Sequence, residues 1–393
     1  MCIRDRAATD QISTPFHFAT TGATTFAPGV EITNFSARYE SVFRPSQSGD
    51  VVFRFQLDGA VTLIIDGEQV AEKVYVKNPT NLYTLQAKAG KEYKVEILFT
   101  QRNEGATLDF DMGKEMEINL DKAVEKVKDA DVVLFAGGIS PSLEGEEMPV
   151  AVPGFKGGDR TDIELPAVQR NLLKALKKAG KKVVFINYSG SAIGLVPETN
   201  TCEAILQAWY PGQAGGTAIV DALWGEYNPG GRLPVTFYKD VNQLPDFEDY
   251  SMKGRTYRYM QQQPLFPFGH GLSYTTFTYG EANLSKNAIG NGETVTLTVP
   301  VSNVGQRDGD EVVQVYLRSP ADKGGPRYTL RAFKRVHIPA GQTKSVTIPL
   351  THESFEWFDE ATNTMHPVAG TYELLYGGSS DETKLKAIVM DVQ

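Results

Sequence analysis

Three glutamates within four positions, Glu144, Glu146 and Glu147, could exchange protons with a substrate. A segment rich in proline and glycine follows them and ends in the pair Asp159 and Arg160. Like charges crowded in one loop disfavour the ionised carboxylate and raise the pKa, so that a glutamate can donate a proton near neutral pH. Most glutamate clusters are solvated turns, so the pattern alone leaves acid/base chemistry and a plain acidic turn as two interpretations.

Other catalytic patterns are absent from the sequence. The five histidines are scattered, without HExxH or His-x-His spacing, and there is no G-x-S-x-G segment. The two cysteines, Cys2 and Cys202, indicate neither a disulfide framework nor a metal site, and Cys202 is expected to be a packing residue. We therefore predict no metal and no cofactor. A nucleotide site in the glycines after Tyr210 is a weaker alternative, because no phosphate-binding lysine follows them.

Composition narrows the class of protein further. The chain has 393 residues, 41% of them hydrophobic, with a net charge of −9, which is typical of a globular protein and argues against nucleic-acid binding. No apolar run approaches the roughly 20 residues of a membrane-spanning helix. The length predicts two to four domains, at about 100–200 residues each.

The central segment, residues 120–282, alternates strands with helices. Buried-type strands are expected near residues 131–138, 182–188 and 204–208, and an amphipathic helix is expected near residues 166–180, with Val168, Leu172, Leu173 and Leu176 on one face. A second helix is expected to begin at the glycines at positions 215 and 216. This alternation predicts a parallel sheet whose ligand-binding loops lie at the carboxyl ends of the strands.

That edge of the sheet would gather the candidate residues. The first strand leads into a long loop, residues 139–161, which we call the acidic loop, and loops of this length are uncommon unless they are functional or disordered. Trp209 and Tyr210 follow the third strand, where their rings could stack on a sugar. Core packing is the alternative, and we expect it for Trp209. His270 is expected to be a structural or interface residue.

The segments on either side are rich in short strands. Residues 7–119 and 283–393 show period-two alternation interrupted by Gly, Asp and Ser turns, which predicts a β-sandwich in each. Residues 1–6, MCIRDR, back-translate to the end of a transposase adapter used in sequencing libraries. We expect them to be an artefact and the natural protein to begin further upstream; a chance N-terminal tail is the alternative.

Several sequence blocks resemble the C-terminal half of glycoside hydrolase family 3, which contains exo-acting β-glucosidases and β-xylosidases. They are LEGEE…GGDRTDIELPAVQ, NPGGRLPVTF and FPFGHGLSYTTF. The final segment, with GDEVVQVYL, resembles the fibronectin type III-like domain of many members. The first segment, with LDGAVTLIIDGE, is similar to the protective-antigen-like β-sandwich that some members carry as an insertion.

The resemblance implies a retaining mechanism with two carboxylates. The nucleophile would be an aspartate on a (β/α)8 barrel, a domain of about 250 residues that is not recognisable in this sequence. The acid/base would lie in an E-x-E-G-x-D-R-like loop, which makes Glu146 the first choice and Glu144 and Glu147 the alternatives. Asp159 and Arg160 match the D-R part, and Arg160 would orient Asp159 or a sugar hydroxyl. The inserted EMPVAVPGFKGG blurs this correspondence.

These patterns together predict a piece of an enzyme. We expect the C-terminal part of a retaining exo-β-glycosidase, with β-xylosidase favoured over β-glucosidase, that is inactive without its barrel. The expected partners are a glycoside or oligosaccharide substrate and the barrel domain, and the expected location is the periplasm or outside the cell. The alternative is a non-catalytic carbohydrate-binding protein, which would not need Glu146.

Overall fold

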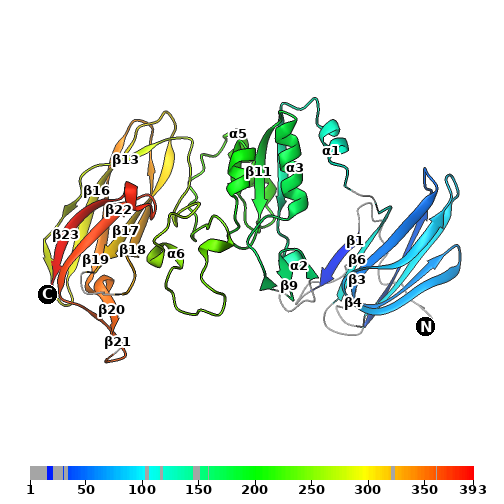
Figure 1. Cartoon of the computed structure of the whole chain (residues 1–393), viewed down its shortest axis with the longest axis horizontal. Coiled ribbons are helices and arrows are strands. Elements are labelled where there is room, and N and C mark those ends of the chain that lie inside the picture. The colour runs from blue at the N-terminus through cyan, green and yellow to red at the C-terminus, as the bar shows by residue number, and fades with distance from the viewer. Residues whose placement is uncertain are drawn as a thin grey trace. The chain divides into compact units, whose positions relative to one another are not determined.

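The computed structural model describes residues 16–20, 30, 34–101, 106–115, 118–144, 151–157, 159–319, 324–359 and 361–393 (Figure 1). For residues 16–20, 77, 78, 106, 142, 144 and 151 the backbone alone is described. The chain divides into two compact units, Met1–Ile118 and Asn119–Gln393.

The first unit is a sheet of long antiparallel strands. Strand β3 pairs with β4 along its length, but on its other side it pairs first with β6 and, after Gly59, with β5. Gly59 has φ +134°, and an added Cβ would lie 2.8 Å from the Thr100 carbonyl, so a glycine is required where β3 changes partner. Phe53 and Leu63, from the two halves of β3, belong to one core. The strands are β1 (Phe16–Thr20), β2 (Phe35–Phe43), β3 (Gly49–Ile65), β4 (Glu68–Ala87), β5 (Tyr93–Gln101) and β6 (Ala106–Gly113).

The second unit begins with the predicted α/β layer. Strands β7 (Val132–Gly138), β11 (Lys182–Tyr188) and β12 (Ala204–Gln207) form a parallel sheet in the order β12-β11-β7. This confirms the expected strand–helix alternation. The helices of the layer are α1 (Leu120–Lys126), α3 (Ala167–Lys178), α4 (Val196–Thr201) and α5 (Gly215–Trp224).

Helix α3 covers the sheet with only part of its predicted apolar face. Leu173 and Leu176 are buried and share a core with Val183 and Phe185 of β11. The prediction for Val168 was wrong, because its side chain is 44% exposed. Val168 lies in the first turn of α3, ahead of the part that packs on the sheet.

The acidic loop contains regular structure that the sequence pattern did not indicate. Helix α2 (Pro141–Glu144) opens it, and strands β8 (Ala151–Val152), β9 (Phe155–Lys156) and β10 (Asp159–Arg160) form a small antiparallel sheet near its end. Two-residue strands gain little by themselves, so their position depends on contacts with the rest of the domain.

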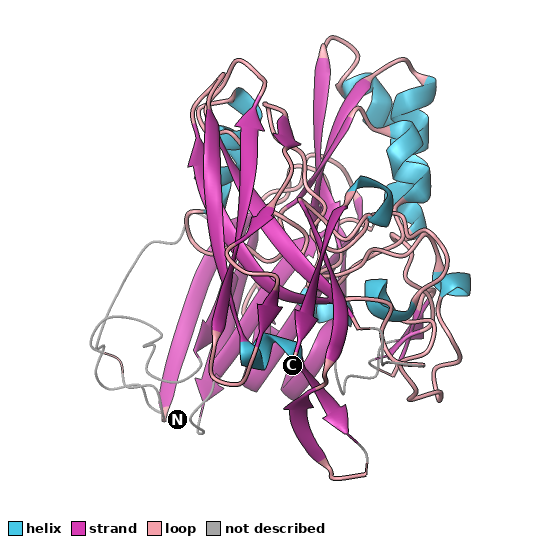
Figure 2. Ribbon diagram, turned by 90° about the vertical axis from the view of Figure 1, so that its left-hand side faces the viewer, coloured by secondary structure: helices cyan, strands magenta, loops and turns pink. Residues whose placement is uncertain are grey.

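A connector of mostly irregular structure, residues 225–276, leads to the C-terminal sandwich. It contains η1 (Val241–Gln243) and α6 (Thr256–Tyr259). One sheet of the sandwich joins β13, β16, β14 and β19, and the other has the order β15-β23-β22-β17-β18. Hairpin β20–β21 projects from the sandwich (Figure 2).

The two sheets of the sandwich enclose one core that includes Val299, Val315 and Leu374. Its elements are β13 (Phe277–Tyr279), β14 (Asn283–Leu284), β15 (Ala288–Ile289), β16 (Thr294–Asn303), β17 (Gly309–Arg318), β18 (Thr329–Ile338), β19 (Thr343–Thr351), η2 (His352–Phe355), β20 (Glu356–Asp359), β21 (Thr364–Pro367), β22 (Gly370–Gly377), η3 (Glu382–Lys384) and β23 (Lys386–Val392).

Side-chain contacts tie the sandwich to the α/β layer and connector. Arg232 of the connector forms an ion pair with Glu311 of β17, and Asn228 donates to the Asp308 carbonyl over 2.8 Å. The Tyr274 hydroxyl donates to the Ala222 carbonyl at the end of α5. Within the described ranges, no helix is long and apolar enough to cross a membrane.

Candidate active site

The carboxyl ends of the three parallel strands meet at one edge, as the sequence predicted. Gly138 at the end of β7 is in register with Tyr188 of β11, and Asn187 is in register with Gln207 at the end of β12. The acidic loop and the segments after β11 and β12 therefore leave the sheet side by side. This is the edge at which open α/β sheets bind ligands.

The three candidate acids lie in or beside a part of the acidic loop that the structure does not describe. Glu144 is the last residue of α2, and its side chain lies outside the described set. Glu146 and Glu147 lie outside the described residues altogether. Their assignment as acid/base candidates therefore remains a prediction.

The start of the acidic loop is fixed by a side chain from helix α3. The Gln169 side-chain amide accepts from the Gly138 N–H over 2.8 Å and donates to the Gly138 carbonyl over 2.7 Å. The Ile139 N–H donates to the Tyr188 carbonyl at 2.7 Å. Gly138 has φ +135°, and an added Cβ would lie 1.9 Å from the same Tyr188 oxygen, so no other residue fits there.

The end of the acidic loop is braced by Arg160. Its guanidinium donates to the carbonyls of Asp162 (3.1 Å) and Glu164 (3.3 Å), and to the Ser191 hydroxyl (3.3 Å). It also lies over the ring of the buried Phe155, 5.6 Å from the ring centroid. Arg160 thus stabilises the turn that follows it, and the neighbouring Asp159 is exposed.

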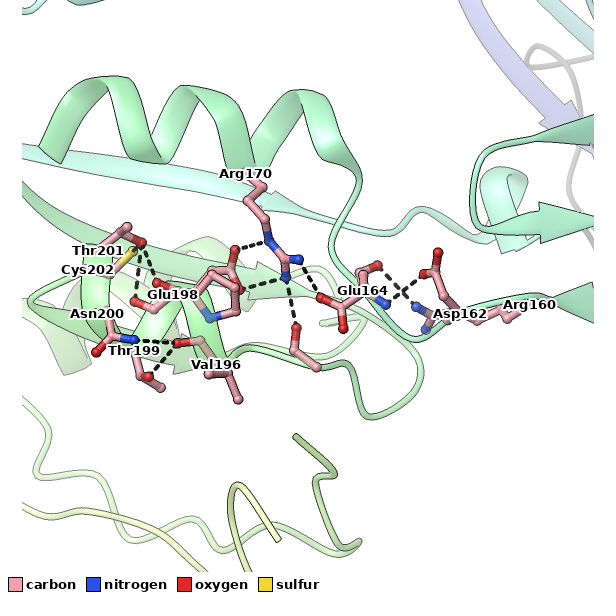
Figure 3. A network of polar contacts seen from close by, with 12 residues as sticks. Arg160, Asp162, Glu164, Arg170, Val196, Glu198, Thr199, Asn200, Thr201 and Cys202 are labelled. Carbon is pink, nitrogen blue, oxygen red and sulfur yellow. Dashed lines mark hydrogen bonds and ion pairs between the residues drawn. The ribbon is translucent and has the colours of Figure 1, made fainter. Parts of the chain in front are cut away.

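A partly buried ion network lies next to this turn (Figure 3). Arg170 of α3 contacts both carboxylate oxygens of Glu198, at 2.7 and 3.0 Å, and also pairs with Glu164. Burial alone would lower the pKa of Arg170, but its hydrogen bonds to Glu198 and Glu164 outweigh burial and raise that pKa. The Glu198 side chain is fully buried. The sequence patterns did not predict this network, because Glu198 lies 28 positions from Arg170 along the chain.

Trp209 and Tyr210 are both near the predicted edge but differ in their contacts. Trp209 is half-buried and packs in a T-shaped arrangement against Phe237, with ring centroids 6.2 Å apart, in agreement with the packing role expected for it. The Tyr210 hydroxyl donates to the Ile139 carbonyl over 2.7 Å, while the residue is 41% exposed. Tyr210 therefore reaches the start of the acidic loop, which sequence reasoning did not anticipate.

Polar side chains also fill the sheet edge between β11 and β12. Asn187 and Ser189 are fully buried, and the Asn187 amide donates to Ser189 over 3.2 Å and also to Gln207. Cys202 is buried, and burial raises the pKa of its thiol, which suits the packing role expected for it. Among the described residues, no cluster of three metal-ligating side chains occurs.

Two family models match the chain. The model described as "Glycosyl hydrolase family 3 C-terminal domain" matches residues 39–274, and the "Fibronectin type III-like domain" matches residues 311–380.

Relatives and solved structures agree with these matches. A Xylan 1,4-beta-xylosidase of Xylanibacter ruminicola is 48% identical over 97% of this chain and 44% of its own length. A periplasmic beta-glucosidase of Salmonella typhimurium is 36% identical over 61% of this chain and 32% of its length. A beta-glucosidase of Kluyveromyces marxianus in complex with glucose has a TM-score of 0.74 at 27% identity, over 92% of this chain and 44% of that chain. The chain thus spans less than half the length of these proteins.

Proposed function

Because the chain belongs to glycoside hydrolase family 3, we propose that it is the C-terminal part of a retaining exo-β-glycosidase whose acidic loop supplies the acid/base. The observation that carries this proposal is the match over residues 39–274, which includes the sheet edge and the loop that leaves it. The nucleophile would come from a (β/α)8 barrel encoded upstream of this chain. The share of the relatives that the chain spans, 44% of the xylosidase, supports this division.

In this mechanism Glu146 would act twice. It would first protonate the glycosidic oxygen while the barrel aspartate attacks the anomeric carbon, giving a covalent glycosyl-enzyme and a free leaving group. It would then take a proton from water, which attacks the same carbon and releases the sugar with its configuration retained. The two carboxyl groups would lie about 5–5.5 Å apart on opposite sides of the scissile bond. Glu144 and Glu147 are the alternatives for this role.

The substrate we propose is a terminal β-linked xylose. The support is the 48% identity to the Xylanibacter ruminicola xylosidase over 97% of the chain. A β-glucosidase is the second candidate, favoured by the Kluyveromyces marxianus beta-glucosidase, whose structure in complex with glucose matches 92% of the chain. Glucose carries a hydroxymethyl group that xylose lacks, so the ratio of kcat/KM for the two nitrophenyl β-glycosides separates the candidates.

The proposal is tested on the protein encoded by the complete gene. Sequencing the complete gene should reveal the barrel, and the full-length protein should hydrolyse nitrophenyl β-xyloside. The 393-residue chain alone should not turn it over, because it would lack the nucleophile. Turnover by the chain alone would refute the proposed division. Saturable sugar binding without hydrolysis by the full-length protein would favour the non-catalytic carbohydrate-binding alternative.

We also propose that the protein acts in the periplasm or outside the cell. The support is the similarity to the periplasmic beta-glucosidase of Salmonella typhimurium, at 36% identity. Fractionation of the source organism, followed by detection of the protein in the periplasmic and culture fractions, tests this location.

A further inference from the structure

We propose that two neighbouring residues of helix α3, Gln169 and Arg170, are positioning residues that hold the two ends of the acidic loop in place. The inference rests on the proposed function, because it gives these residues a catalytic consequence through the acid that the loop carries. It concerns residues 138–139 and 160–164, which contain the two ends of the acidic loop and the residues that adjoin them, and the side chains that contact these residues.

Gln169 acts on the start of the loop as if it were a neighbouring strand. Its side-chain amide pairs with both backbone groups of Gly138, through hydrogen bonds of 2.8 and 2.7 Å. A peptide group of an adjacent strand would offer the same donor and acceptor. Since a side chain at position 138 would collide with the Tyr188 carbonyl, the backbone itself is the only part of Gly138 that can be held.

Arg170 acts on the segment that directly follows the loop, through Glu164. Its guanidinium pairs with the Glu164 carboxylate and donates to the Gly194 carbonyl over 3.1 Å. The Gly194 N–H in turn donates to the Ile163 carbonyl over 2.7 Å. Segment 163–164 is therefore fastened to the segment that follows β11. An added Cβ at Gly194 would lie 2.9 Å from the Lys239 carbonyl, so the backbone at Gly194 is closely packed and has little room for a side chain.

The buried Glu198 sets the orientation of Arg170. It receives two hydrogen bonds from the guanidinium, at 2.7 and 3.0 Å, and its side chain has no exposed surface. A planar guanidinium held on one side by a bidentate carboxylate has little choice of direction for its remaining donors. The same helix thus fixes both ends of the acidic loop through consecutive residues.

If the acidic loop is loosened, the loss of rate should depend on the leaving group of the substrate. Protonation by a general acid matters when the departing group is a poor one, such as the sugar of xylobiose, and matters little for dinitrophenolate, which departs without a proton. A displacement of about 1 Å far from the chemistry can reduce the rate by about 10²-fold. A loss caused only by poorer folding would affect both substrates equally.

The test is Gln169→Leu in the full-length enzyme, with Asn171→Leu, an exposed position of the same helix, as the matched control. We expect Gln169→Leu to lower kcat/KM for xylobiose by about 10²-fold and to leave kcat/KM for dinitrophenyl β-xyloside, which reports the glycosylation step alone, nearly unchanged. Gln169→Glu keeps the acceptor for the Gly138 N–H, so its kcat/KM for xylobiose should lie between the values for the wild type and Gln169→Leu. If Gln169→Leu does not fold, Gln169→Glu takes its place in the comparison.

Arg170→Lys tests the other end of the loop, because it keeps the positive charge beside Glu198 but removes the planar guanidinium that contacts Glu198 through two nitrogens. It should show the same selective loss on xylobiose. Equal losses on both substrates, or losses no larger than that of Asn171→Leu, would overturn the inference while leaving the proposed function intact. A wild-type protein that hydrolyses neither substrate would instead refute the proposed function itself.

Discussion

Arg232 and Glu311 form an ion pair of 2.9 Å between the connector and the C-terminal sandwich, and their side chains are only 9% and 7% exposed. Burial raises the pKa of Glu311, and the neighbouring Arg232 offsets only part of that rise. The pair therefore removes two charges from water at the junction of two domains. Buried pairs of this kind contribute little net stability when intact but are costly to break.

Glu311→Gln should destabilise the chain strongly. The guanidinium of Arg232 would stay charged and buried without a counter-ion, at a cost of about 3–5 kcal/mol in the free energy of unfolding. Urea denaturation of the 393-residue chain measures this cost. The double variant Arg232→Met, Glu311→Leu removes both charges, and its free energy of unfolding should fall less than that of Glu311→Gln. A double variant at least as unstable as Glu311→Gln would contradict this account.

His270 should make the folded chain less stable at acid pH. Its ring stacks on Phe266 with centroids 5.0 Å apart, and burial, with smaller contributions from Lys384 and Arg232, lowers its pKa. The folded chain then binds fewer protons than the unfolded chain, so the stability present above the unfolded pKa of about 6.5 is lost as pH falls from there through the lower folded pKa. His270→Gln should reduce the decline of Tm between about pH 8 and pH 5.

His366 provides a control of opposite sign. Its contacts with the Pro367 carbonyl and with Asp359 raise the pKa of His366, and they outweigh the smaller lowering caused by burial. Its stabilising contribution is present below about pH 6.5 and is lost as pH rises through the folded pKa. His366→Gln should therefore steepen the decline of Tm toward acid pH. Identical effects of the two substitutions would contradict the assigned directions.

Tyr210 allows its hydroxyl and its ring to be tested separately. Tyr210→Phe removes the hydrogen bond to the Ile139 carbonyl and should reduce stability by about 1 kcal/mol without changing KM. Tyr210→Ala also removes the ring, and it should raise KM of the full-length enzyme if the predicted contact with sugar exists. Steady-state kinetics on nitrophenyl β-xyloside give both values. An unchanged KM in Tyr210→Ala would exclude the sugar contact.

Local sequence patterns predicted the framework of the site. Apolar runs such as Val132–Gly138 and Lys182–Tyr188 indicated the parallel strands, and their order along the chain then placed the acidic loop at the ligand-binding edge. These features depend on near neighbours and on the fixed geometry of strand–helix–strand units. For the same reason the pattern misjudged Val168, since periodicity cannot show where along a helix the packing begins.

The residues that hold the site together could not be read from the sequence. Gln169 is 31 positions from Gly138, and Arg170 is 28 positions from Glu198. In the sequence, Gln169 and Arg170 resemble the solvated side of an amphipathic helix, and no pattern singles out Glu198. Each acquires its role only when the sheet brings the distant segment next to α3.

The most direct test of the central claim is the kinetics of Glu146→Gln in the full-length protein, with Glu144→Gln and Glu147→Gln measured beside it. If Glu146 is the acid/base, kcat/KM for xylobiose should fall by about 10²–10⁴-fold in Glu146→Gln, and hydrolysis of dinitrophenyl β-xyloside should retain its glycosylation rate. Azide should then attack the glycosyl-enzyme in place of water, without needing a general base, and yield β-xylosyl azide. Unchanged hydrolysis of xylobiose in all three variants would contradict the assignment of the acid/base to the acidic loop.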